Sequence, residues 1–339
     1  MDEDYAIVVG INTYPKLTPL TSAVNDANAF AEWLRDPEGG GITSDDRLQL
    51  IMSPDEQQAN LPAEPLQKRI DNALKSFGVG NGHIIGRRLY LYFSGHGIGV
   101  DFDDVAMLMA NATETFLDSN IGLRPYRSFF HARDLFEQIV YILDCCRDQV
   151  KHLKVNPIAP DLEHPEEIPA PEVADYVFLA AAHGEKAFAV PKGSGLLTQA
   201  LIEGLNGEAA DQKGEITSLT LHDFVKKQVP ELAKNLKVKQ APKFQDLSDA
   251  REILLCKVEK KVQVKIHVAP GMTGTLVVRD GKFKEIQRND IALNNPWTVE
   301  LIYSRLPYII QHLPSGGFLE LFLNQIKDKN YEFQFSSSN

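Results

Sequence analysis

Two side chains that could do chemistry together stand at the ends of two apolar runs. Residues 138–146 read QIVYILDCC, and residues 89–97 read LYLYFSGHG. A thiol attacks an acyl carbon as its thiolate, and an imidazole that takes the thiol proton is its usual partner. The sequence therefore suggests a nucleophilic cysteine and a general base, His96, displayed by two strands.

Strand geometry separates the two adjacent cysteines. Side chains alternate between the faces of a strand, so Asp144 and Cys146 point one way and Cys145 the other. We expect Cys145 to pack against a helix as a small apolar side chain and Cys146 to be the nucleophile. Glycines on both sides of His96 let a substrate backbone approach closely. The amides of Gly97 and Cys146 could then donate to a developing oxyanion.

Each motif has a plainer interpretation when it is taken alone. A Gly-His-Gly at a strand end is a weak signal, and adjacent cysteines are more often buried structure than a nucleophile. His183 competes as the base by position, although a polar loop residue is its plainer interpretation. The fifty-residue separation of His96 and Cys146 strengthens the pair, because caspases have a similar separation. The cysteines lack the Cys-x-x-Cys spacing of metal sites, so we expect no metal or other cofactor.

Composition limits the classes of partner. The 339 residues carry 35 basic and 46 acidic side chains, a net charge of −11, which argues against nucleic acid and anionic membranes as partners. Three cysteines do not make a disulfide framework. The acidic N-terminus does not resemble a signal peptide, and no apolar run is long enough to span a membrane. We expect a soluble, cytoplasmic protein.

Short apolar runs alternate with helix-period segments over the first 255 residues. The pattern predicts strands at 5–11, 47–52, 88–93, 139–145 and 176–182. It predicts helices at 25–35, 66–77, 196–205 and 219–228, and another helix that ends within 133–137. Strands that are apolar throughout indicate an α/β fold, with a mainly parallel sheet covered by helices on both faces. Ligands gather at the carboxyl ends of such strands, where His96, Cys146 and His183 lie.

Two stretches interrupt this pattern. Lys151–Pro171 is rich in proline and acidic residues and is predicted to be an exposed connector within an α/β domain of residues 1–256. From residue 257 the apolar residues alternate with polar ones, which predicts a small all-β, sandwich-like domain over 257–339. We expect this domain to dock a regulator or partner protein, or to restrain the first domain. Its core is expected to include Trp297, Tyr303, Tyr308 and Phe318.

Taken together, the motifs resemble those of the caspase-like cysteine peptidases, and of the metacaspase branch in particular. The resemblance runs from residue 5 to about 255 and rests most on 92–97 (YFSGHG) and 144–146 (DCC). Further matches are the opening strand at 7–12, the first-helix motif at 23–28, and the small-subunit motifs at 177–182 and 195–201. The resemblance implies a large-subunit part over about 1–150 and a small-subunit part over 172–256.

The resemblance also implies roles for single residues. His96 would be the general base, Cys146 the nucleophile, and the Gly97 and Cys146 amides the oxyanion hole. In metacaspases three residues line the pocket for the residue before the scissile bond, and here they are Asp26, Ser94 and Asp144. Two carboxylates in a pocket select Arg or Lys through charge-assisted hydrogen bonds. Without the resemblance, Asp26 is about as well explained by the dipole at the start of a helix.

Some positions depart from the family's pattern. The pocket's usual cysteine is Ala23, and residues 146–149 read CRDQ where the family has Cys-His-Ser-Gly. The carboxylates of the metacaspase calcium site are not matched, since Asn111 stands where one of them is expected, so no calcium dependence is predicted.

The sequence thus predicts a cysteine endopeptidase that cleaves proteins after Arg or Lys. By resemblance, it would serve a bacterial stress or defence response. An inactive caspase-like scaffold that binds partners is the alternative from another class, although the intact His–Cys pair argues against it. A thiol redox or acyl-transfer module that uses Cys145 and Cys146 is a weaker third interpretation.

Overall fold

The chain folds into two compact units. The structure is a computed structural model that describes residues 3–54, 63–80, 84–113, 120–133, 135–148, 157–162, 173–191, 193–246, 252–258, 261–281, 283–291, 296–302, 307–323 and 330–336. One unit comprises residues 1–202 and 222–253, and the other comprises 203–221 and 254–339. The predicted division at residue 256 stays a prediction, and the connector predicted at 151–171 lies outside the described residues except for 157–162.

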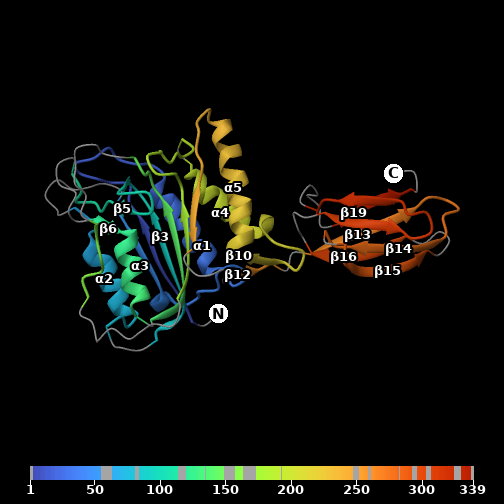
Figure 1. Ribbon diagram of the computed structural model, residues 1–339, viewed down its shortest axis with the longest axis horizontal. Helices are drawn as coiled ribbons and strands as arrows, with labels where there is room; N and C mark the ends of the chain where they lie inside the picture. The colour runs from blue at the N-terminus through green and yellow to red at the C-terminus, as the bar shows by residue number, and fades with distance from the viewer. Residues whose placement is uncertain are drawn as a thin grey trace. The chain divides into compact units, whose positions relative to one another are not determined.

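A six-stranded sheet forms the centre of the first unit (Figure 1). Its order is β11-β9-β7-β3-β1-β2, and only β11 runs antiparallel to its neighbour. In that order the strands span Lys243–Asp246, Ala174–Leu179, Phe136–Asp144, Gly86–Ser94, Asp4–Gly10 and Leu48–Met52. The inner strands are buried on both faces, which explains why their sequences are apolar throughout.

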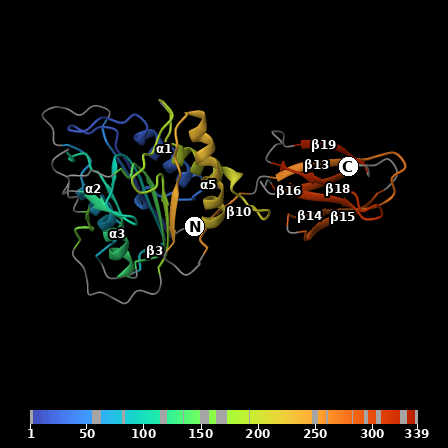
Figure 2. The same ribbon diagram turned by 45° about the horizontal axis from the view of Figure 1, so that its top comes forward.

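Helices cover both faces of this sheet, as the alternating pattern predicts (Figures 1 and 2). Helices α2 (Gln67–Ser76) and α3 (Leu123–His131) lie on one face. The other face carries α1 (Ala23–Arg35), α4 (Leu196–Glu203) and α5 (Ser218–Asn235). The α/β fold with a mainly parallel sheet is therefore confirmed.

A smaller sheet extends the first unit beyond the ends of the central strands. Its order is β4-β5-β6-β8, and these strands span Gly97–Gly99, Val105–Met107, Asn120–Gly122 and Pro157–Ile158. Strand β4 begins directly after His96, and the Leu108 N–H donates to the His96 carbonyl at 2.9 Å. The smaller sheet therefore fixes the backbone that follows the histidine, and β3 of the central sheet precedes it.

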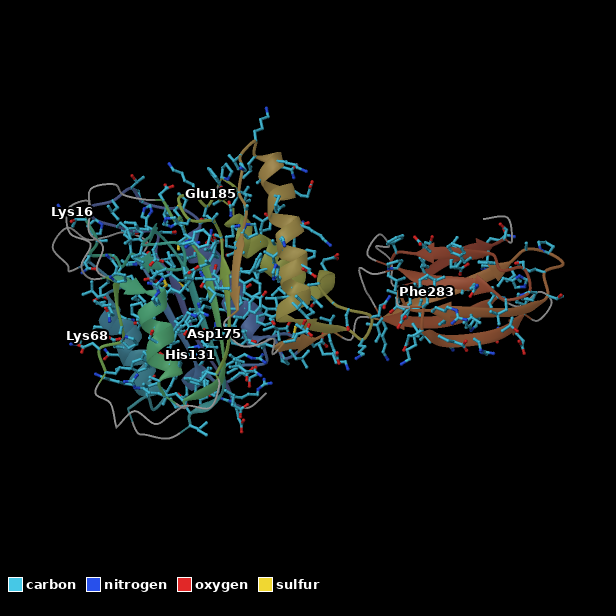
Figure 3. All side chains as sticks on the ribbon, in the orientation of Figure 1. Lys16, Lys68, His131, Asp175, Glu185 and Phe283 are labelled. Carbon is cyan, nitrogen blue, oxygen red and sulfur yellow. The ribbon has the colours of Figure 1, made fainter. Side chains whose placement is uncertain are left out.

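An ion-pair network ties α3 to the opposite end of the central sheet. Asp175, which is fully buried near the start of β9, accepts hydrogen bonds from Arg127 at 2.6 and 2.8 Å and lies 3.0 Å from His131 Nε2. Figure 3 shows His131 and Asp175 together at this end, with Glu185 at the other end of the sheet. These charges hold the pKa of Asp175 below its usual range despite its burial. The network therefore secures the end of the sheet opposite the predicted chemistry.

The second unit is mainly a β-sandwich, in agreement with the alternation after residue 257. One sheet has the order β16-β13-β19, and the other has the order β15-β14-β17-β18. Strands β13 to β19 span, in chain order, Lys261–Val268, Gly274–Arg279, Glu285–Ile291, Trp297–Ile302, Tyr308–His312, Phe318–Leu321 and Asn330–Phe335. The same unit contains a kinked helical turn, Gly204–Glu208, and the pair β10 (Glu215–Thr217) and β12 (Leu254–Lys257).

Several local expectations are corrected by the structure. The helix expected to end within 133–137 ends at His131, and β7 already begins at Phe136. Strand β15 was not expected, because most of its residues are exposed and it shows no apolar alternation. Tyr308 is buried, as expected, whereas Phe318 is 54% exposed and does not belong to the core. Tyr303 lies outside the described residues. Each described helix is too short or too polar to cross a membrane.

The packing of α1 on the sheet gives a test of this architecture. Phe30 is fully buried and stacks on Tyr92 of β3 with ring centroids 4.7 Å apart. We expect Phe30→Ala to lower the free energy of unfolding by about 3–5 kcal/mol, because it leaves a cavity under the helix. Phe102→Ala is the matched control, since that ring is 76% exposed, and should change it by less than about 0.5 kcal/mol. Equal effects in urea denaturation would contradict the placement of α1.

Candidate active site

The register of the central strands brings the predicted site together. Ser94 of β3 is paired with Asp144 of β7 and with Gly10 of β1. His96 comes two residues after Ser94, and Cys146 comes two residues after Asp144. The two residues therefore follow the ends of adjacent parallel strands at the same edge of the sheet. The Gly95 N–H donates to the Asp144 carbonyl at 3.4 Å and continues the ladder past the strand ends. The structure thus places the predicted nucleophile and base on neighbouring strand ends.

The two cysteines occupy different environments. Cys145 is 2% exposed and packs in the core on the α2–α3 face, as strand alternation predicts. Cys146 is half-buried, and its sulfur accepts a hydrogen bond from the Ala187 N–H at 3.4 Å. Burial raises the pKa of both thiols, and for Cys146 the Ala187 N–H works against that increase. Cys146 is therefore the more exposed of the pair, and its sulfur receives a backbone hydrogen bond.

Gly97 lies directly against the cysteine pair. A Cβ atom at this position would come within 2.7 Å of the Cys146 carbonyl oxygen and within 2.5 Å of the Cys145 sulfur. Only glycine fits this approach without a shift of the backbone. Gly97 is therefore in close contact with both cysteines.

His96 is held by a segment that precedes α1. Its Nε2 lies 2.7 Å from the Thr18 carbonyl oxygen. Its backbone N–H donates to the Tyr14 hydroxyl at 2.9 Å, and the centroids of the His96 and Tyr14 rings are 4.7 Å apart. The Tyr14 hydroxyl in turn donates to the Leu108 carbonyl at 3.1 Å. A proton on Nε2 directed at Thr18 leaves the lone pair on Nδ1, which is the form that a general base requires.

This orienting group is one that the sequence did not reveal. No side chain that orients His96 is evident in the sequence, and a backbone carbonyl carries no residue-type signal. The segment is anchored at the end of β2, where the Ser53 hydroxyl accepts the Asn12 and Thr13 N–H groups at 2.9 and 3.2 Å.

The three predicted pocket residues come together on the α1–α4 side of the sheet. Asp26 of α1 is 1% exposed and accepts hydrogen bonds from the Ser94 hydroxyl at 3.1 Å and from the Gly195 N–H at 2.8 Å. Asp144 is 6% exposed and accepts from the Thr198 N–H at 3.0 Å and from its hydroxyl at 2.7 Å. Asp26 thus lies in the first turn of α1, as the dipole interpretation requires, and is also a buried partner of the strand ends.

The two carboxyl groups destabilise each other's charged form. Burial, followed by the nearby charge of Asp144, raises the pKa of Asp26 to about 7 against the hydrogen bonds that it accepts. Burial also raises the pKa of Asp144. Within the described residues, the partners of both groups are N–H and O–H donors, and no Lys, Arg or His pairs with either. The pair therefore holds a proton near neutral pH and lacks a cation.

Three residues of the 194–198 segment complete this acidic pair and were not singled out for it in the sequence. The Ser194 side chain hydrogen-bonds to Asp26, and the Thr198 hydroxyl lies 2.6 Å from the Tyr92 hydroxyl. Gly195 lies so close to Asp144 that a Cβ atom would overlap the carboxylate. A Ser-Gly followed by a helix suggests a turn, and only the fold places that turn over two aspartates.

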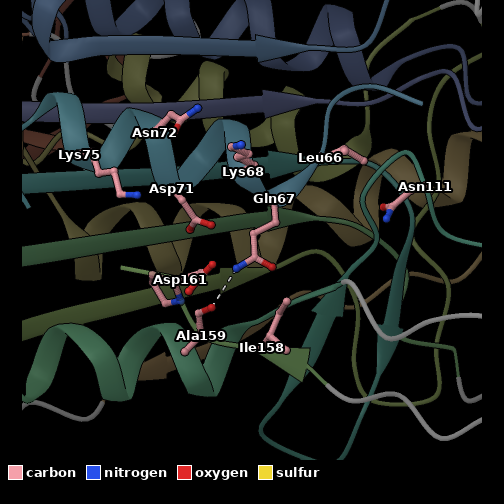
Figure 4. Close-up of a pocket in the computed structure, with 11 residues that line it drawn as sticks. Leu66, Gln67, Lys68, Asp71, Asn72, Lys75, Asn111, Ile158, Ala159 and Asp161 are labelled. Carbon is pink, nitrogen blue, oxygen red and sulfur yellow. Dashed lines mark hydrogen bonds between the residues drawn. The ribbon is translucent and has the colours of Figure 1, made fainter. Parts of the chain in front are cut away.

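Two other positions weighed in the sequence lie away from this arrangement. His183 packs against Gly99, and its ring centroid is 6.5 Å from that of Phe102. Asn111 lines a separate pocket of about 670 Å³, formed by α2 and residues 158–161 (Figure 4). Its Oδ1 is buried and has no hydrogen-bond partner among the residues that the structure describes. Across the described segments no three His, Cys, Asp or Glu side chains come together as a metal site.

Comparison with known proteins assigns the family. The profile of the caspase domain, a peptidase family, matches residues 3–253. The chain therefore belongs to the caspase domain family, whose members are cysteine-type peptidases. The match covers the central sheet and both predicted catalytic positions, and it confirms the resemblance noted in the sequence.

Individual relatives are distant. A probable protease of a Desulfuromonadales bacterium is 26% identical over 215 residues, which are 60% of this chain and 26% of that protein. The chain thus spans about a quarter of the length of this curated relative. Among solved structures, caspase-1 from Spodoptera frugiperda matches with a TM-score of 0.49 and 12% identity, over 76% of this chain and 91% of the other.

The buried carboxyl of Asp26 predicts a pH dependence of stability. Its pKa is about 7 in the folded state and about 3.8 when exposed, so the folded state binds its proton more tightly. Its contribution to stability is therefore present below about pH 4 and is lost, by up to about 1.4 kcal/mol per pH unit, as the pH rises to 7.

We expect Asp26→Asn to remove this loss, so that its unfolding free energy falls less than that of the wild type between pH 5 and pH 8. Urea denaturation at both pH values measures the difference. The exposed Asp46→Asn variant is the control and should follow the wild type. A slope unchanged by Asp26→Asn would show that this carboxyl does not hold the extra proton.

Proposed function

We propose that this protein is a cysteine endopeptidase that cleaves protein substrates after Arg or Lys. The observation that carries the proposal is the buried pair of carboxyl groups, Asp26 and Asp144, next to the strand end that bears Cys146. A caspase domain supports the peptidase class, and the acidic pair supports the choice of substrate.

Electrostatics favour a cationic side chain at this position. Two carboxylates that are withdrawn from water repel each other and lose solvation, which is why the pair retains a proton. A guanidinium or ammonium group that entered the pocket would replace that proton and form charge-assisted hydrogen bonds. An aspartate side chain from a substrate would add a third negative charge, so cleavage after Asp is disfavoured.

The proposed mechanism uses Cys146 and His96. The Cys146 sulfur attacks the carbonyl carbon of the basic residue, and the thiol proton passes to His96 Nδ1. Throughout, the Nε2–H of His96 keeps its hydrogen bond to the Thr18 carbonyl. The Gly97 and Cys146 amides bind the oxyanion. The imidazolium then gives its proton to the leaving amine as the C–N bond breaks, which leaves a thioester. Water, deprotonated by the same imidazole, hydrolyses the thioester and restores the thiol.

The biological setting is a broader part of the proposal. By resemblance to bacterial members of the family we place the activity in a stress or defence response, with a regulatory protein docking on the second unit. The chemistry proposed for Cys146 needs no cofactor. The alternative of an inactive scaffold finds no support in the comparisons, which point to proteases.

The assignment of the nucleophile can be tested with fluorogenic peptides that end in Arg, Lys or Asp. We expect Cys146→Ala to lower kcat/KM for the Arg and Lys peptides by about 10³-fold or more, because the variant lacks the thiol that is proposed to form the thioester. Cys145→Ala removes a buried core thiol and should keep kcat/KM within about tenfold. Loss of cleavage in Cys145→Ala with retention in Cys146→Ala would reverse the assignment. Absence of cleavage by the wild-type protein would favour the scaffold alternative.

The acidic pocket predicts the substrate preference and its pH dependence. We expect Asp144→Asn to lower kcat/KM for Arg peptides by about 10–100-fold, since a charge-assisted hydrogen bond contributes about 1.5–3 kcal/mol. In the wild type, KM for Arg peptides should fall as the pH rises through about 7, where Asp26 loses its proton. Asp46→Asn is the control and should leave both KM and its pH profile unchanged. An Arg preference that survives both Asp26→Asn and Asp144→Asn would refute the acidic pocket.

A further inference from the structure

Segment 180–188 leaves the end of β9 and returns to the predicted nucleophile. The Arg147 N–H donates to the Glu185 carbonyl at 3.0 Å, and the Gly184 N–H donates to the Arg147 carbonyl at 2.8 Å. Ala187 then places its N–H 3.4 Å from the Cys146 sulfur. The thiol is therefore contacted by a backbone group of a connecting segment, whose position depends on what holds that segment.

A single buried side chain joins the two ends of this segment. Gln240 lies between α5 and β11 and is 2% exposed. Its Oε1 accepts the Phe188 N–H at 2.7 Å, and its Nε2 donates to the Ala180 carbonyl at 3.0 Å. The Phe188 N–H belongs to the Ala187–Phe188 peptide, whose carbonyl oxygen lies 3.7 Å from the Cys146 sulfur. The Ala187 N–H belongs to the preceding peptide, so Gln240 holds the backbone directly next to the group that donates to the sulfur.

We propose that Gln240 is a positioning residue for the nucleophile, whose side-chain amide holds segment 180–188 so that the Ala187 N–H stabilises the Cys146 thiolate. The proposal rests on Cys146 as the nucleophile of the proposed function. Gln240, about 90 positions downstream of Cys146 in the sequence, would thus contribute to the reactivity of the thiol.

The charges around Cys146 make this hydrogen bond important. Burial and the carboxylates of Asp148 and Asp144 all raise the pKa of the thiol. The groups that lower it are the Ala187 N–H and the Lys186 ammonium, which also lies 3.8 Å from Asp148. Both belong to the segment that Gln240 holds, so loosening the segment weakens both stabilising contacts. The other ionisable groups at this strand end are Cys145, Arg147 and the half-buried His96, together with His183 and Glu185 of the segment itself.

The amide is the group that this position requires. The Phe188 N–H needs an acceptor, and the Ala180 carbonyl needs a donor, at the two ends of one planar side chain. Methionine has a similar length and supplies neither. An ionised glutamate supplies the acceptor only and sets its charge against the Ala180 carbonyl, whereas a protonated glutamate supplies both.

The test is the pH dependence of Cys146 alkylation by iodoacetamide, followed by mass spectrometry from about pH 6 to about pH 11.5, because the pKa of this thiol is raised above its ordinary value. We expect Gln240→Met to move the midpoint upward by about one pH unit and to slow alkylation at pH 7 about tenfold, because the thiolate loses its N–H donor. The rate at the alkaline plateau should stay unchanged.

Gln240→Glu provides a second variant that keeps the shape of the side chain. We expect its alkylation rate relative to the wild type to be close to one at low pH, where the introduced carboxyl is protonated, and to fall as that carboxyl ionises. Gln67→Met is the matched control, because Gln67 also donates to a backbone carbonyl, that of Ala159 at 2.9 Å, on α2 away from the site (Figure 4). It should reproduce the wild-type profile.

Two outcomes would overturn the proposal. An unchanged midpoint with a higher plateau in Gln240→Met would mean that the segment only shields the sulfur, and an equal shift in Gln67→Met would mean a general loss of stability. The assay uses no peptide substrate, so its outcome does not depend on peptidase activity. A shifted midpoint in a protein that cleaves no peptide would uphold the positioning role of Gln240 and reject the proposed function.

Discussion

The parallel hydrogen-bonded register of β3 and β7 is the constraint on which the candidate site depends. It sets Ser94 beside Asp144 and sends His96 and Cys146 away from the same edge of the sheet. A slip of one residue would exchange the faces, turning Asp144 into the apolar core and Cys145 out of it. Because both strands are buried on both faces, such a slip would be very costly, and the sheet fixes the chemistry along with the fold.

The buried acidic pair lowers the stability of the folded protein at the end of these strands. Asp26 and Asp144 are buried as a like-charged pair, and N–H and O–H donors from Ser94, Gly195 and Thr198 compensate only part of the cost. Strongly shifted pKa values cluster at functional sites, so the cost of this pair marks it as a candidate binding site. The same interaction that weakens the free protein at high pH thus gives the pocket its proposed preference for a basic side chain.

Backbone groups from distant segments hold both proposed reactive side chains. The Thr18 carbonyl orients His96, and the Ala187 N–H reaches Cys146. A buried polar side chain with two hydrogen bonds links each segment to its surroundings. Tyr14 of the first segment binds the His96 N–H and the Leu108 carbonyl, and Gln240 binds the two ends of the second segment. Rigid strands thus set the approximate positions, and these two side chains determine the hydrogen bonds that would tune the reactivity of the pair.

The sequence by itself determined the class of fold, the candidate residues at the strand ends, and the burial of Cys145, because apolar periodicity records which face of an element is buried. It did not reveal β15, whose exposed residues leave no such record, and it placed the end of α3 too late. Only the tertiary structure brought Thr18, Gly195 and Gln240 to the site. Their hydrogen bonds join residues 52 or more positions apart and use backbone groups, which no local pattern of side chains encodes.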